Sequence, residues 1–131
     1  MSLIVRYITP LMLVSGALTT TMIYAAIAPA AALQSTFGES LTGPTAELVV
    51  RNWGVLIAIV GLMLVHGAWY PATRRLALAA AITSKVAFIS LVLSNGGRYL
   101  DHGAGTAVMV DSVMVLLFVA YLAATRRTTL R

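Results

Sequence analysis

The sequence predicts an all-α integral membrane protein, a four-helix bundle whose helices run up, down, up and down. Sixty per cent of the residues are hydrophobic and the mean hydropathy is +0.91, whereas globular proteins average about 45–50% apolar residues. Several apolar stretches are long enough to cross a hydrocarbon core of about 30 Å, which takes about 20 helical residues. Only 10% of the residues are charged, and the basic ones cluster beside the apolar stretches, as in membrane proteins.

Length and composition exclude several classes of protein. The 131 residues have room for a single domain, residues 1–131, without a large soluble appendage. The chain has no cysteine, which excludes disulfides, cysteine-ligated zinc and iron–sulfur clusters. The net charge of +5 could suggest nucleic acid, but the arginines flank apolar segments, so we expect no nucleic-acid partner.

The first helix is expected over residues 8–31. Pro10 suits its first turn, and Pro29 marks its outer end. Arg6, the apolar run and its alanine-rich exit also resemble a cleavable signal peptide, but the run is longer than the usual 7–15 or so residues of such an apolar region. We therefore expect a span that is kept in the protein.

Three further helices are expected, over residues 44–70, 73–95 and 104–125. Pro44 suits the first turn of the second helix and Pro71 ends it, while Asn95-Gly96-Gly97 is a strong stop for the third. Such short connections make neighbouring helices antiparallel. The second helix carries a stripe of small residues that permits close helix packing in lipid: Gly54, Ala58 and Gly61.

The charges predict the orientation in the membrane. One side of the predicted bundle collects basic residues, with Arg74 and Arg75 in a short hairpin: Arg6, Arg74, Arg75, Arg126, Arg127 and Arg131. The other side has no net excess of positive charge: Glu39, Glu47, Arg51, Arg98 and Asp101. By the positive-inside rule, both termini lie in the cytoplasm and the first and third loops lie outside.

Lys85 and Asp111 are the most informative residues because each stands alone in an apolar helix. An ionisable group at bilayer depth costs about 2.5–3.5 kcal/mol even on the lenient insertion scale. At 1.5 Å per helical residue, Lys85 lies about 15 Å deep and Asp111 about 10 Å deep from the outer side. We expect the two side chains to face each other inside the protein, either as a structural ion pair that fixes helix register or as part of a functional site.

Further polar residues fall in the outer half of the predicted bundle. They indicate a cavity open to the outside, with ligand-binding candidates Arg51, Asn52, Lys85, Asp111, Tyr24 and Asn95. Arg51 and Lys85 would neutralise a ligand, while Asp111 would hold Lys85 or exchange a proton with it.

The histidines and Ser84 have competing interpretations. His66 could be a haem or metal ligand or a proton relay, but its position beside Trp69 and Tyr70 favours an interfacial aromatic belt. His102 fits a solvated loop. We expect no metal and no cofactor. Ser84 and Lys85 are adjacent helical residues that point about 100° apart, so a serine–lysine dyad is disfavoured.

Four features together resemble a known family. Pro29 closes the first helix, Arg51-x-x-Gly54 opens the second, and Lys85 and Asp111 stand in the third and fourth. The chain in this respect resembles small four-helix bacterial membrane proteins of the DoxX-like sort. The resemblance implies a multi-pass bundle in the bacterial inner (cytoplasmic) membrane. Some such proteins are associated with quinone-linked sulfur oxidation, but no residue of this chain allows us to infer that activity for it.

Three functions remain open. The chain could bind or transport a small anionic or amphiphilic ligand, of lipid or quinone type, in its polar cavity. It could be an accessory or structural subunit of a larger membrane complex, or a homo-oligomer. It could also be a membrane-embedded enzyme with Lys85 as acid or base, although no catalytic motif is present.

Overall fold

A computed structural model describes residues 3–39 and 41–129, with side chains described up to Arg126. Within those residues it is helical and has no strand. The elements are α1 (Leu3–Arg6), α2 (Ile8–Thr20), η1 (Thr21–Ile23), α3 (Tyr24–Ile27), α4 (Pro29–Phe37), α5 (Pro44–Trp69), α6 (Pro71–Leu93) and α7 (Gly103–Thr129). Four stretches are long and apolar enough to cross a membrane: Ile8–Ile27, Pro44–Trp69, Pro71–Leu93 and Gly103–Arg126. The predicted all-α fold with four helices of spanning length is confirmed.

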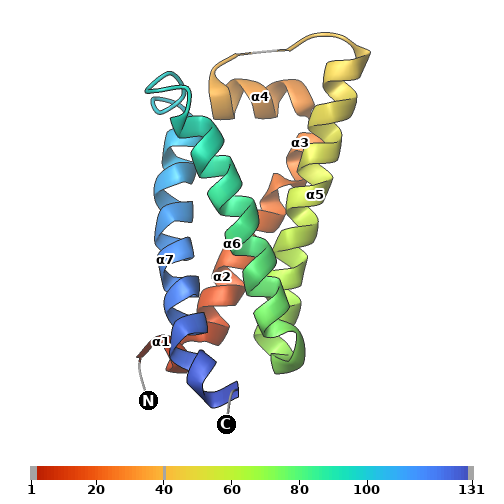
Figure 1. The fold of residues 1–131 in the computed structure, drawn as a ribbon. Helices are drawn as coiled ribbons and strands as arrows, with labels where there is room; N and C mark the ends of the chain where they lie inside the picture. The colour runs from red at the N-terminus through yellow and green to blue at the C-terminus, as the bar shows by residue number, and fades with distance from the viewer. Residues whose placement is uncertain (1–2, 40, 130–131) are drawn as a thin grey trace.

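The long helices lie side by side, and α4 lies across one end of them (Figure 1). The segment between α6 and α7 is at the same end as α4. The turn between α5 and α6 lies at the opposite end, together with α1 and the last turns of α7 (Figure 1). Packing follows the chain, since α2 packs on α5, α5 on α6 and α6 on α7.

The first predicted helix ends earlier than expected, at Ile27 instead of residue 31. Ala28 leaves the helical conformation (φ −131°, ψ 71°) because the ring of Pro29 disfavours a helical residue before it. Pro29 then occupies the first turn of α4, where its missing N–H costs no hydrogen bond. Residues 29–37, of which 29–31 were expected in the first helix and the rest as loop, therefore form a separate helix that turns away from the axis of α2.

Two contacts fix the far end of α4. Phe37 packs between Trp53 of α5 and Tyr99 of the α6–α7 segment, with ring centroids 6.0 Å and 5.3 Å away. Glu39 accepts a hydrogen bond of 2.9 Å from Arg98 Nε. This hydrogen bond and the charge of Glu39 raise the pKa of Arg98, an exposed residue. The helix is thus attached to both α5 and the connection that precedes α7.

The other predicted boundaries are close to those observed, with one correction at the turn between α5 and α6. Only Tyr70 separates these helices, and Pro71 begins α6. Pro71 was expected to end the second helix, so α6 begins two residues earlier than predicted, and Arg74 and Arg75 lie in its first turns. Arg74 donates hydrogen bonds of 2.9 and 2.8 Å to the carbonyls of Gly67 and Ala68, which satisfies two orphan acceptors at the end of α5.

Helices α2 and α5 cross at unusually short distance. A methyl group added at Gly16 would lie 2.8 Å from the carbonyl oxygen of Gly61, and one added at Gly61 would lie 2.8 Å from that of Gly16. One added at Gly54 would lie 2.8 Å from Ala26 N. The predicted stripe of small residues on α5 is therefore buried against the first span, as close packing in lipid requires.

The interior is best filled at the end that holds the α5–α6 turn. One apolar cluster there joins the four long helices: Ile8, Met12, Leu64, Ala68, Ala77, Leu78, Ala81, Phe118 and Tyr121. Two smaller clusters lie toward α4: Ala25, Ala32, Leu33 and Val50 in one, and Val92, Ala104 and Val108 in the other.

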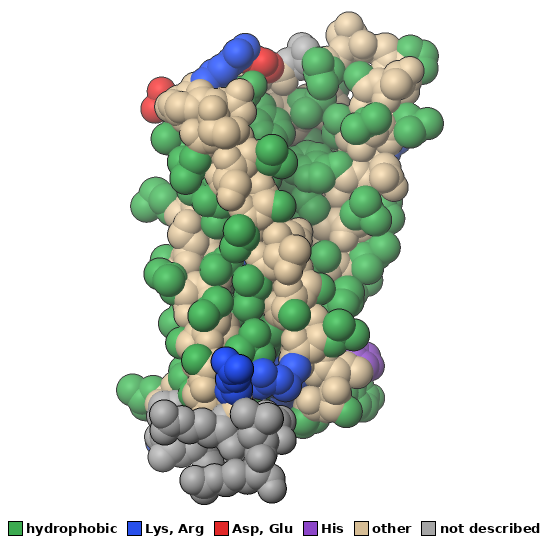
Figure 2. All heavy atoms as spheres, in the orientation of Figure 1, with side chains coloured by type: hydrophobic (Ala, Val, Ile, Leu, Met, Phe, Trp, Pro, Cys, Tyr) green, Lys and Arg blue, Asp and Glu red, His purple; other side chains and the backbone are tan. Residues whose placement is uncertain are grey.

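The face of the bundle shown in Figure 2 is apolar along its length, and its charged side chains gather at the two ends. Large exposed apolar side chains occur on every long helix, for example Leu18, Leu56, Leu91 and Leu116. Exposed apolar side chains on each long helix suit contact with lipid. Arg131 and the side chain of Arg127, counted above with the basic residues, lie outside the described part of the chain.

We predict that Gly61→Ala destabilises the protein although alanine is the better helix former. The added methyl has no room against Gly16 and Thr20, so α2 and α5 must separate. Overpacking of this kind costs about 1–3 kcal/mol. The measurement is reversible unfolding of the purified protein in mixed micelles. Gly97→Ala is the control, because a methyl there meets nothing within 4 Å. Equal unfolding of the two variants would contradict the close crossing.

Candidate functional site

The site is built around an ion pair between α6 and α7. Lys85 Nζ lies 2.7 Å from Asp111 Oδ1, and the two side chains are 9% and 19% exposed. The expectation that these residues face each other inside the protein is confirmed. The short distance is typical of a charge-assisted hydrogen bond, which offsets part of the cost of removing both charges from water.

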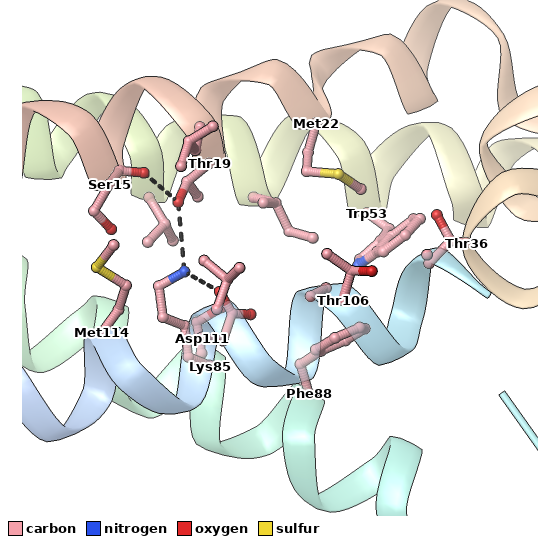
Figure 3. Close-up of a pocket in the computed structure, with 17 residues that line it drawn as sticks. Ser15, Thr19, Met22, Thr36, Trp53, Lys85, Phe88, Thr106, Asp111 and Met114 are labelled. Carbon is pink, nitrogen blue, oxygen red and sulfur yellow. Dashed lines mark hydrogen bonds and ion pairs between the residues drawn. The ribbon is translucent and has the colours of Figure 1, made fainter. Parts of the chain in front are cut away.

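A third span joins this pair through a hydroxyl of α2. Lys85 Nζ lies 3.5 Å from Thr19 Oγ1, a long hydrogen bond. Thr19 in turn donates a 2.7 Å hydrogen bond to the carbonyl of Ser15, one turn earlier in the same helix. Figure 3 shows the resulting chain from Ser15 through Thr19 and Lys85 to Asp111. Threonine can accept from the ammonium group because its own proton is already used in its helix.

A cavity of about 480 Å³ lies beside the ion pair, enclosed by all four spans and α4. Its walls are mostly aliphatic, aromatic or methionine side chains, and the complete lining is Ser15, Leu18, Thr19, Met22, Thr36, Trp53, Ile57, Val60, Ser84, Lys85, Phe88, Gly103, Thr106, Ala107, Val110, Asp111 and Met114. Among these residues only Lys85 and Asp111 carry a charge.

The cavity has a polar end deep in the bundle and a second end near α4. Ser15, Thr19, Lys85 and Asp111 gather at the deep end (Figure 3). Trp53 and Thr36 lie toward the other end, and Met22, Phe88 and Thr106 lie between the two ends (Figure 3). The arrangement can hold one molecule that is polar at one end and apolar along its body.

Arg51, predicted to line the cavity, does not do so. Its guanidinium donates a hydrogen bond to the carbonyl of Ala26, in the last turn of α3. The break before Pro29 leaves carbonyls at the end of α3 without a helical donor, and such carbonyls attract cationic side chains. Arg51 therefore satisfies a backbone carbonyl at this break in the helix.

Tyr24, Asn52 and Asn95, also predicted as ligand-binding residues, lie outside the cavity lining as well. The hydroxyl of Tyr24 lies 2.9 Å from Ser35 Oγ and so links α3 to α4. Asn95 donates a 2.8 Å hydrogen bond to the carbonyl of Leu91, at the end of α6. Asn52 is exposed. Of the six predicted residues, the cavity brings together Lys85 and Asp111.

Sequence reasoning missed polar cavity residues that the fold supplies. Thr36 is buried on α4, a segment expected as loop. Thr106 lies on α7 one turn and a half before Asp111 and lines the same cavity. Ser15 and Thr19 are four residues apart, the spacing that places two side chains on one helix face. From this spacing, Ser15 could have been predicted to share the cavity-facing side of the helix with Thr19.

The two histidines lie at opposite ends of the molecule. His66 is exposed, stacks on Tyr70 with ring centroids 4.5 Å apart, and has Nδ1 2.9 Å from Thr73 Oγ1. This geometry fits the aromatic-belt interpretation. The His102 ring lies against Gly38, where an added methyl would meet it. No group of three or more His, Cys, Asp or Glu side chains in the described residues could hold a metal ion.

We predict strong energetic coupling between Lys85 and Asp111. Lys85→Met or Asp111→Leu alone leaves a buried charge without its partner, which costs about 3–5 kcal/mol of unfolding free energy. The double variant removes both charges, so its loss is smaller than the sum of the two. Reversible unfolding in mixed micelles measures all three. The exposed pair of Arg98 and Glu39 supplies the control cycle, where little coupling is expected. Additive losses at Lys85 and Asp111 would contradict the ion pair.

No family model matches this chain, and neither a curated protein nor a solved structure matches it. The resemblance to DoxX-like proteins therefore stays a prediction.

Proposed function

We propose that this protein is a membrane-embedded binding protein for a small amphiphilic molecule of lipid or quinone type. The polar head of the ligand would lie against Lys85 and Asp111, and its apolar body would lie along the walls toward α4. The observation that carries the proposal is a cavity of about 480 Å³ with apolar walls and a single buried ion pair at its deep end.

The size and chemistry of the cavity support a small-molecule ligand. Ligand sites in proteins are usually about 300–1,000 Å³, mostly apolar, with a few polar groups that orient the ligand. An ionisable pair inside a membrane helix bundle is by default a functional candidate. A purely structural pair would need no space beside it, whereas this pair lines an open volume together with Thr19 and Met114.

The walls between α2 and α7 support entry from the membrane. These helices are not among the pairs that pack closely in the described chain; α7 meets the first segments through α1 and α4. Leu18 on α2 and Val110 on α7 both line the cavity, yet they are 54% and 39% exposed. Residues that face both the cavity and the lipid surface mark a lateral opening, which suits a ligand dissolved in the bilayer.

The proposal includes an orientation for the protein. We infer an up-down-up-down bundle with both termini in the cytoplasm, because Arg6, Arg74, Arg75 and Arg126 gather at the end opposite α4. The α4 end carries charges of both signs: Glu39, Glu47, Arg51, Arg98 and Asp101. The cavity then lies in the outer half of the membrane, with α4 on the outer surface.

Single cysteines test this orientation cleanly, since the chain has none of its own. We predict that Leu41→Cys reacts with a membrane-impermeant maleimide in intact bacterial cells that express the protein. Ala72→Cys should react only after the cells are opened. Both positions are exposed, so access to the reagent is set by the membrane. The reverse pattern would overturn the orientation, and reaction of both from one side would overturn the four-span topology.

Filling the cavity tests ligand binding. We predict that Ala107→Phe lowers cavity labelling by a long-chain diazirine alcohol, or by the matching carboxylate, at least about tenfold in lipid nanodiscs. The new ring occupies the space of the ligand body, and tenfold corresponds to about 1.4 kcal/mol of binding free energy. Labelled residues are identified by mass spectrometry of peptides.

Ala120→Phe is the matched control, because Ala120 lies on the same helix and is exposed outside the cavity. It should label like the unmodified protein. The thermal unfolding of both variants is recorded beside the labelling. If neither probe labels cavity residues in the unmodified protein, or if Ala107→Phe labels equally at unchanged stability, the proposed function is wrong.

A further inference from the structure

We propose that the deep end of the cavity selects an amphiphile whose head is an uncharged hydroxyl, in preference to one with an anionic head. This inference rests on the proposed function and specifies its ligand class. It replaces the anionic alternative that the isolated Lys85 suggested in the sequence.

The charges at the deep end cancel. Lys85 and Asp111 are the charged residues of the cavity lining and form a direct pair. Arg51, the second cation expected there, donates to the Ala26 carbonyl outside the lining. An anionic head that approached Lys85 would also approach the Asp111 carboxylate, and like charges at low dielectric repel strongly. It would also lose its hydration without gaining an unmatched cation.

The hydrogen-bonding capacity left over suits a hydroxyl. An ammonium group has three protons, and two of those of Lys85 point at Asp111 and Thr19. Asp111 Oδ2 has no hydrogen-bond partner among the described residues. A hydroxyl can donate its proton to this oxygen and accept from the remaining proton of Lys85. A carboxylate can accept only, so it cannot satisfy Asp111.

Ser15 adds an independent observation. It is 2% exposed, and its hydroxyl oxygen is the buried side-chain polar atom without a hydrogen-bond partner in the described chain. A buried hydroxyl is normally satisfied, in helices often by the carbonyl one turn earlier. Here it points from α2 into the space facing Met114, beside the Thr19–Lys85 contact (Figure 3). A polar ligand head at this end of the cavity would supply the partner that this oxygen lacks.

The experiment compares three diazirine probes of equal chain length in lipid nanodiscs: a primary alcohol, its methyl ether and the matching carboxylate. The unmodified protein should show labelling of cavity residues by the alcohol about tenfold above that by the ether or the carboxylate. The ether isolates donation to Asp111, because it accepts hydrogen bonds but cannot donate one. A hydrogen bond to a charged group is worth tenfold or more in affinity.

Two variants assign the selectivity to named atoms. Ser15→Ala should lower labelling by the alcohol several-fold, while Ser90→Ala, at an exposed serine of α6, should leave it unchanged. Asp111→Asn should reverse the order of alcohol and carboxylate, because Lys85 then has no countercharge. If Asp111→Asn does not fold, the preference for a hydroxyl head is still tested by the three probes on the unmodified protein and by Ser15→Ala.

The failures of the two proposals are distinguishable. Equal labelling of the cavity by alcohol and carboxylate would overturn the selectivity and leave an amphiphile-binding cavity. Equal labelling by alcohol and ether would overturn the role of Asp111 as acceptor. No labelling of cavity residues by any probe would overturn both this inference and the proposed function.

Discussion

A charge inside an apolar helix bundle must be matched by another charge and hydrogen-bonded, and this constraint organises the molecule. Lys85 can be satisfied only if α7 presents Asp111 at the same height, so the pair fixes the register of α6 against α7. The contact with Thr19 adds α2 to the same point. Three of the four spans thus meet at one polar position, and the apolar walls of the cavity extend from it toward α4.

The two halves of the bundle differ in how they are packed, and the difference explains why the cavity persists. Toward the α5–α6 turn, large side chains such as Phe118 and Leu64 fill the interior and the glycines of α2 and α5 bring those helices into contact. Toward α4 the spans are held apart at their tips by a helix that lies across them (Figure 1). The closely packed half therefore supports the ion pair, and the half crossed by α4 leaves space beside it.

The features that depend on a single helix could be predicted from the sequence. The four spans, the close-packing stripe around Gly61 and the inward direction of Lys85 and Asp111 all follow from hydropathy, spacing and the cost of buried charge. The break at Ala28 was harder, because Pro29 ends one helix and starts another equally well. Because α4 was not predicted as a separate helix, the position of Thr36 in the cavity lining could not be predicted either.

Depth in the membrane proved a poor guide to which polar residues face the cavity. Arg51 and Asn95 both sit near helix ends, where unpaired carbonyls compete for any donor, and both are used there. Lys85 and Asp111 lie in mid-helix, where every carbonyl is already bonded within the helix, so their charges can be satisfied only across helices. The same reasoning applies to Ser15, whose hydroxyl makes no bond within its own helix. Three polar groups that are not satisfied within their own helices, those of Ser15, Lys85 and Asp111, therefore lie together at the deep end of the cavity.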